Sequence, residues 1–190
     1  MISHSVRIAA LAVALLAVPV VQAAEVAGVK VDEAIKVGAN ELALNGVGVR
    51  TKVFIKVYVG ALYATQKSST PAALLDAATP RRMVMRMLRD IDADTLYGAL
   101  RDGLKDNNSE AELAALKAPT DQFAEIMKKI GTAKNGDSVA IDFTAEGVAV
   151  SFNGEARGKV ASVPFARALL KVWLGENPVD SSLKKALLGG

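Results

Sequence analysis

The chain contains no cysteine, a single histidine and few aromatic residues, which make up 5% of its 190 residues. Without cysteine there is no disulfide framework, no thiol nucleophile and no thiolate metal site. The histidine, His4, lies in a segment that we expect to be removed. The remaining chain then lacks the side chain on which Ser-His-Asp catalysis and histidine metal sites depend. We therefore expect neither a metal nor a cofactor.

The charge of the chain is nearly balanced, because 23 Lys and Arg residues stand against 20 Asp and Glu residues. Proteins that bind nucleic acid normally need a concentrated basic surface. This balance gives no support for such a surface, and we expect no nucleic-acid partner.

The first 23 residues have the pattern of an export signal. Arg7 supplies a positive charge, an apolar run follows from Ile8 to Val21, and Val21-Gln22-Ala23 fits the small-x-small rule for cleavage. The run is shorter than the ~20 residues of a spanning helix, and charged residues follow it at once. We expect cleavage after Ala23, one domain over residues 24–190, no stable membrane anchor, and a periplasmic or secreted protein.

Alternation of apolar and polar residues predicts β-strands in three main regions. The odd positions from Val49 to Tyr63 form a largely apolar face, so residues 47–64 are predicted to be one long strand or a hairpin. Residues 82–89 and 138–158 show the same period, and Asn153-Gly154 favours a hairpin turn in the latter region. Shorter alternation predicts opening strands at 29–31 and 35–37.

Apolar residues recur at helical spacing in the other parts of the chain. They predict helices over 94–106, 119–130 and 163–174, with further helices starting near Ser109 and after Asp180. Strands on both sides of a helical block are typical of an α+β fold. We expect a mainly antiparallel β-sheet covered on one face by helices.

Arg50 is the first candidate for a binding role, because it follows Gly46 and Gly48 within a mainly apolar segment. A planar guanidinium suits a carboxylate, which it can hold by two parallel hydrogen bonds. The alternative is an arginine on the solvated face of a strand or one paired with Asp or Glu. Tyr58 and Tyr63 could supply hydroxyls to the same site, or could pack in the sheet. Strict alternation groups Arg50 with Tyr58, but a bulge near the glycines would change that grouping.

Three other patterns favour structural interpretations. Met83, Met85 and Met87 could line an apolar pocket, although ordinary core packing is the favoured interpretation. Asp90, Asp92 and Asp94 imitate the start of a calcium loop, but the later glycine and glutamate are missing, which favours helix capping. Gly46-Val47-Gly48 is too short for a dinucleotide motif, which favours a backbone bend or a close approach.

The segments Leu44-Asn-Gly-Val-Gly-Val-Arg50 and Val57-Tyr-Val-Gly-Ala-Leu-Tyr63 resemble the opening of chalcone isomerase-like domains. The resemblance continues through 82–104, 136–158 and 166–182, and it covers almost all of the chain after Ala23. It implies an open-faced sandwich of sheet and helices. It is nearer to exported bacterial relatives and to non-catalytic, fatty-acid-binding members than to the plant enzymes.

The resemblance also implies roles for individual positions. In the plant enzymes an arginine that matches Arg50 helps to position a phenolate, assisted by a threonine and a tyrosine. Tyr58 stands about where that threonine belongs, and Ile91-Asp92 about where that tyrosine belongs. In the fatty-acid-binding members an arginine and a tyrosine hold the carboxylate, which implies Arg50 with Tyr63 or, as second choice, Tyr58.

We therefore expect an exported binding protein that holds a fatty acid or similar carboxylate amphiphile in a sheet–helix cleft. The alternative is an intramolecular lyase, an isomerase of the chalcone isomerase type, acting on an unknown enone-like substrate. A third interpretation is a protein-interaction domain with a filled core and no cavity.

Overall fold

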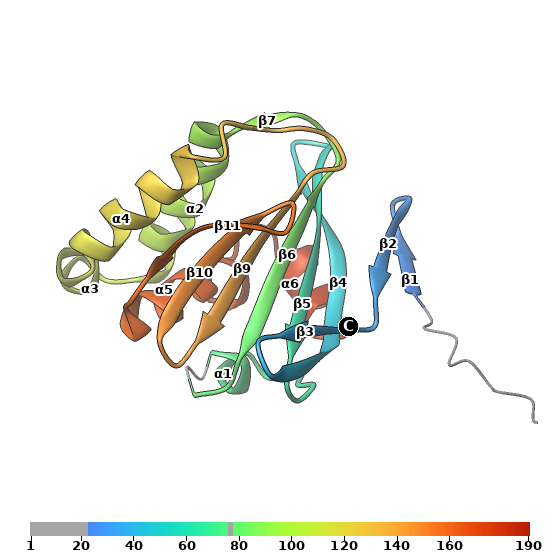
Figure 1. Cartoon of the computed structure of the whole chain (residues 1–190), viewed down its shortest axis with the longest axis horizontal. Helices are drawn as coiled ribbons and strands as arrows, with labels where there is room; N and C mark the ends of the chain where they lie inside the picture. The colour runs from blue at the N-terminus through green and yellow to red at the C-terminus, as the bar shows by residue number, and fades with distance from the viewer. Residues whose placement is uncertain (1–22, 76–77) are drawn as a thin grey trace, which may run out of the picture.

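The computed structural model describes residues 23–75 and 78–190, which form an antiparallel seven-stranded sheet with helices packed on one face (Figure 1). The strand order is β11-β10-β9-β6-β5-β4-β3. The strands are β3 (Ala34–Val37), β4 (Asn40–Lys52), β5 (Ile55–Ala64), β6 (Arg81–Met87), β9 (Ser138–Thr144), β10 (Gly147–Phe152) and β11 (Glu155–Val160). The predicted strands at 47–64, 82–89 and 138–158 are thus confirmed, the first and last as hairpins. The expected export signal lies outside the described residues, except for Ala23.

Apart from the short α1 (Pro71–Leu74), the helices come from the two parts of the chain in which the sequence predicts them, 93–128 and 163–187. They are α2 (Ala93–Asn107), α3 (Glu110–Ala115), α4 (Lys117–Lys128), α5 (Val163–Leu174) and α6 (Ser181–Leu187). In Figure 1 α5 and α6 lie behind the strands, while α2 and α4 stand beside the β11 edge of the sheet. Side chains of all four helices share one core cluster with the sheet, so both helical segments pack on the same face. The predicted α+β architecture, with an antiparallel sheet covered on one face by helices, is confirmed.

The opposite face of the sheet is partly covered by a hairpin of β1 (Ala23–Val26) and β2 (Val29–Asp32). Val31 of this hairpin joins a small apolar cluster with Val59 and Tyr63 of β5. A second small sheet pairs β7 (Ile91–Asp92) with β8 (Thr132–Ala133), close to the start of α2.

The main core lies between the sheet and the helices, and large side chains fill it. Trp173 and Phe123 come from the helices, while Met83, Met85 and Met87 come from the facing side of β6, and each is almost completely buried. The core interpretation of the methionine stripe is therefore confirmed, because flexible thioethers fill the irregular space beneath α2 and α5.

Helix α6 lies unusually close to β4, and the glycines of β4 make this possible. A methyl group added at Gly46 would lie 2.1 Å from the carbonyl oxygen of Ala186, and one at Gly48 would lie 2.6 Å from the Ala186 side chain. A β-bulge at Asn45 turns its amide toward the end of the helix, where it donates to the Leu187 carbonyl at 2.7 Å. The close-approach interpretation of the two glycines is confirmed.

The turn between β4 and β5 consists of Val53 and Phe54, whose φ angles are 47° and 67°. Positive φ at both central residues of a two-residue hairpin is the pattern of a type I′ turn, which normally selects Asn-Gly. A β-branched and an aromatic residue are strained in this region.

We expect Gly46→Ala to lower the free energy of unfolding by about 3 kcal/mol, because the new methyl group collides with backbone that cannot move without displacing α6. The matched control is Gly98→Ala within α2, where nothing lies within 4 Å. Since alanine favours helix, the control should gain about 0.5–1 kcal/mol. Urea unfolding followed by circular dichroism measures both free energies of unfolding. A Gly46→Ala variant as stable as the natural chain would refute the close approach.

Candidate functional site

A pocket of about 550 Å³ opens where the β4–β5 hairpin meets the start of α2. Its walls come from β4 and its turn, from β5, from the segment that contains β7, and from the first turns of α2. They consist of Arg50, Lys52, Val53, Ile55, Val57, Arg89, Asp90, Ile91, Asp92, Thr95, Leu96, Gly98, Ala99 and Asp102. The volume lies within the range of small-molecule sites, which are about 300–1,000 Å³.

Arg50 is the buried cation of this pocket. Only 9% of the residue is exposed, and its Nε is buried with no hydrogen-bond partner. Within residues 23–75 and 78–190, no oxygen accepts a hydrogen bond from the guanidinium and no carboxylate pairs with it. The two Nη atoms are not among the buried atoms, so they reach the solvent of the pocket and are open to an anion. The alternative of an arginine paired with Asp or Glu is wrong for the described chain, and the arginine stem is buried rather than laid on a solvated face.

An acid next to the Arg50 strand is already engaged. The negative charge of Asp180 contributes to raising the pKa of Tyr58, and its carboxylate accepts backbone hydrogen bonds from Thr51 of β4 and from Ser182 and Leu183 of α6. It thus caps α6, as predicted, and ties this helix to β4. The contact of α6 with β4 therefore holds the carboxylate on the backbone and leaves the guanidinium free.

Tyr58 is the cross-strand neighbour of Arg50, and its ring lies beneath the guanidinium. The guanidinium carbon lies 5.7 Å from the centre of the Tyr58 ring, within the range of a cation–π contact. The Tyr58 hydroxyl accepts a hydrogen bond of 2.9 Å from Nε1 of Trp173, and burial raises the pKa of Tyr58. Because the hydroxyl is occupied and the residue is 1% exposed, Tyr58 positions Arg50 and does not line the pocket.

Tyr63 lies on the opposite face of the sheet. It packs with Val31 and Val59, its hydroxyl donates to the Asp32 carbonyl at 3.0 Å, and burial raises its pKa to about 12. The structure thus brings Tyr58, not Tyr63, to Arg50, and the preference for Tyr63 is corrected. The pairing of β4 with β5 shifts register twice, at Asn45 of β4 and at Val57 of β5, and between the two shifts Arg50 pairs directly with Tyr58 on the helix face.

The side chains of Asp90 and Asp92 border the pocket without forming a metal site. Asp92 accepts the backbone N–H and the hydroxyl of Thr95, and these hydrogen bonds lower its pKa. Asp90 accepts the backbone N–H of Asn135. The capping interpretation is confirmed for Asp92, and no metal-binding group of acidic side chains occurs in the described part of the chain.

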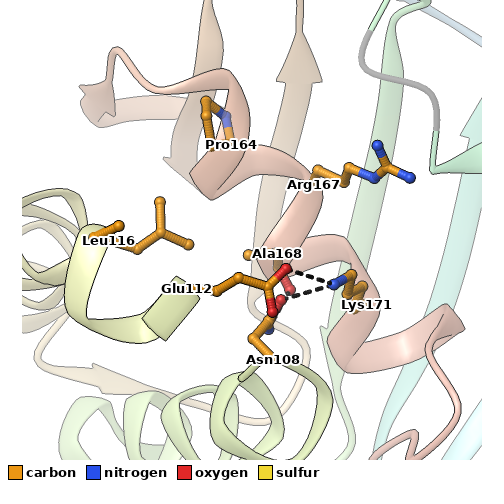
Figure 2. A pocket seen from close by; sticks show the side chains of 8 residues that line it. Asn108, Glu112, Leu116, Pro164, Arg167, Ala168 and Lys171 are labelled. Carbon is orange, nitrogen blue, oxygen red and sulfur yellow. Dashed lines mark hydrogen bonds and ion pairs between the residues drawn. The ribbon is translucent and has the colours of Figure 1, made fainter. Parts of the chain in front are cut away.

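A second pocket, of about 410 Å³, lies between α3 and α5, and its cation is satisfied (Figure 2). Lys171 Nζ lies 3.6 Å from a carboxylate oxygen of Glu112 and donates to Asn108 Oδ1 at 3.0 Å, as the dashed lines in Figure 2 show. Arg167, in the same pocket, is exposed to solvent. Neither cation combines burial with a missing partner, so the pocket at Arg50 is the stronger candidate.

Comparison with known proteins identifies the family and the fold. The profile of the chalcone isomerase-like family matches residues 23–189. The chain belongs to the chalcone isomerase-like family. Among solved structures, this chalcone isomerase-like chain is similar to the fatty-acid binding protein AtFAP1 of Arabidopsis thaliana, with a TM-score of 0.68 and 16% identity. The match covers 85% of this chain and 92% of that one, and it shows a shared fold. No curated protein matches the sequence.

The positions that the family resemblance singles out now have places in this chalcone isomerase-like fold. Arg50, Ile91 and Asp92 all line the pocket, whereas Tyr58 lies beneath Arg50. Sequence reasoning did not find the hydrogen bond from Trp173 to Tyr58, which joins residues 115 positions apart. It also did not find that Asp180 accepts the backbone N–H of Thr51, the neighbour of Arg50. No local pattern signals such pairings. The apolar face of 163–174 indicated only that Trp173 would be buried.

We expect Tyr58→Phe to lower the free energy of unfolding by about 1–3 kcal/mol, because it leaves the Trp173 N–H buried without an acceptor. Tyr63→Phe is the matched control, and it should cost about 0.5–1.5 kcal/mol, since the Asp32 carbonyl can turn to water. Urea unfolding followed by circular dichroism measures the two. A smaller loss in Tyr58→Phe than in Tyr63→Phe would contradict the arrangement.

Proposed function

We propose that the protein binds the carboxylate of a fatty acid or similar amphiphile at Arg50, in the pocket between the β4–β5 hairpin and α2. The observation that carries this proposal is an arginine that is 9% exposed, lines the pocket and makes no hydrogen bond or ion pair within the described chain. A carboxylate would supply the missing charge and the acceptors for parallel N–H donors.

The walls of the pocket suit an apolar tail. Val57, Ile91, Leu96 and Ala99 lie near Arg50, while Lys52 and Arg89 stand exposed among the lining residues. Because the main core is filled, the tail would lie along this apolar wall at the end of the sheet rather than run between sheet and helices. The similarity of fold to a protein described as fatty-acid binding supports the same class of ligand.

The lyase alternative receives less support from the pocket. Where the resemblance implies a tyrosine in the enzymes, the pocket presents Ile91 and Asp92. Neither an aliphatic side chain nor a carboxylate can donate the hydrogen bond that a tyrosine hydroxyl would supply to a developing phenolate. Binding therefore remains our preferred function.

We expect Arg50→Gln to weaken fatty-acid binding about 10- to 150-fold, the equivalent of a charge-assisted contact of about 1.5–3 kcal/mol. Arg89→Gln, in the same pocket but exposed, should weaken it about fivefold or less. Calorimetric titration of the purified protein with a fatty acid and its methyl ester tests this, and the ester should be insensitive to Arg50→Gln.

Equal affinity for acid and ester, or no loss in a folded Arg50→Gln variant, would remove Arg50 from the site. Conversion of a chalcone to one flavanone enantiomer, faster than the spontaneous reaction and abolished in Arg50→Gln, would instead favour the lyase alternative.

We further propose that the protein acts outside the cytosol as a periplasmic or secreted protein. The proposal rests on the pattern of residues 1–23. In the described part of the chain, no helix has the length and apolar character needed to cross a membrane. N-terminal sequencing of the protein from its own host should give Ala24 as the first residue. Recovery of intact Met1 in the membrane fraction would contradict export with cleavage.

A further inference from the structure

The tip of the β4–β5 hairpin presents apolar side chains to solvent. Phe54 is 99% exposed, Val53 78% and Ile55 49%. Apolar residues scattered singly on a surface need no explanation, but three consecutive ones at the end of a hairpin form an exposed apolar patch. These three residues, Val53–Ile55, are called the apolar tip below.

The apolar tip is also strained. Val53 and Phe54 both adopt positive φ, a conformation that β-branched and aromatic residues rarely adopt. Asn-Gly would make the same turn without strain. The fold therefore carries two bulky side chains in an unfavourable conformation, at a place where Phe54 contacts almost nothing in its own chain.

The surroundings of the apolar tip are basic. Lys52 and Lys56 flank it, both are exposed, and neither forms an ion pair with any residue that the structure describes. Arg89 stands exposed nearby in the pocket wall. The acidic residues of that wall are Asp90, Asp92 and Asp102; the first two accept backbone N–H groups beside β7 and α2, and Asp102 pairs with Arg101.

We propose that the apolar tip is a docking site for an anionic lipid bilayer, with Phe54 inserted among the headgroups and Lys52 and Lys56 against the phosphates. An apolar side chain between cations matches the boundary between acyl chains and anionic headgroups. The contact is peripheral and reversible, which agrees with the absence of a stable anchor expected from sequence.

The place of the apolar tip adds a reason for this partner. Val53 and Ile55 belong both to the tip and to the pocket wall that contains Arg50, so insertion would bring the pocket mouth to the membrane surface. An amphiphile could then pass between bilayer and pocket with little of its tail in water. The docking itself goes beyond the proposed function and does not depend on which ligand the pocket holds.

Flotation of the purified protein with vesicles tests the proposal. Vesicles of phosphatidylcholine with phosphatidylglycerol at about 7:3 should bind the protein, and pure phosphatidylcholine or high salt should weaken binding. Phe54→Ser should lower the partition coefficient at least about tenfold. Lys52→Ser with Lys56→Ser should lower it about 10- to 30-fold.

Two controls separate docking from folding and from charge. Val53→Asn with Phe54→Gly relieves the strain, so this variant should resist urea better than the natural chain and still lose vesicle binding. Lys36→Ser with Lys105→Ser removes the same charge from exposed lysines away from the tip and should bind vesicles nearly as well as the natural chain.

Failure of the natural chain to bind anionic vesicles, or unchanged binding in Phe54→Ser, would overturn the proposal. So would equal binding by the two double-lysine variants. If Phe54→Ser converts a dimer to a monomer in sedimentation and leaves vesicle binding unchanged, the tip joins two copies of the chain instead. In vesicle-free buffer Phe54→Ser should keep its fatty-acid affinity, while Arg50→Gln should keep vesicle binding, so failure of either proposal leaves the other testable.

Discussion

The close contact between α6 and β4 is the constraint on which the candidate site depends. Gly46 and Gly48 remove the side chains that would hold the helix away, and Asn45 fixes its C-terminal end by a hydrogen bond to Leu187. At the other end, Asp180 caps α6 and also accepts the N–H of Thr51. One helix is thus attached at both ends to one strand. The next side chain on the same face of that strand is Arg50.

This attachment explains how a buried arginine can be left without an ion pair. The carboxylate of Asp180 accepts hydrogen bonds from backbone N–H groups of both α6 and β4. If it paired with Arg50 instead, α6 would lose its N-terminal cap. The Tyr58 ring gives the guanidinium some electrostatic compensation, and Trp173 holds that ring through its hydroxyl. An anion that pairs with Arg50 in the pocket would offset the remaining desolvation cost, and this difference would contribute to the free energy of binding.

Sequence reasoning succeeded where the signal was periodic. The strands of 138–158, the helix of 163–174 and the methionine face of β6 follow from spacing alone, because one face of each element must be buried. It identified Arg50 because a cation after two glycines in an apolar segment is unusual. The family resemblance supplied the ligand class.

It could not decide between Tyr58 and Tyr63, because the decision rests on a bulge. A regular two-residue hairpin would pair Arg50 with Val57, on the face of Tyr63, but Val57 is an extra residue in β5 and the pairing shifts to Tyr58. Nor could it find the pocket wall that α2 provides, since that wall is formed by tertiary packing. The Val53-Phe54 turn escaped prediction because neither residue belongs to the usual turn chemistry.

The hydrogen bond between Trp173 and Tyr58 connects the one tryptophan of the chain to the candidate site. The indole is 1% exposed and donates to the Tyr58 hydroxyl, while the Arg50 guanidinium lies over the Tyr58 ring. Because indole emission depends on the local electric field, an anion bound at Arg50 would change the intrinsic fluorescence of the protein, without an attached dye and without a second indole.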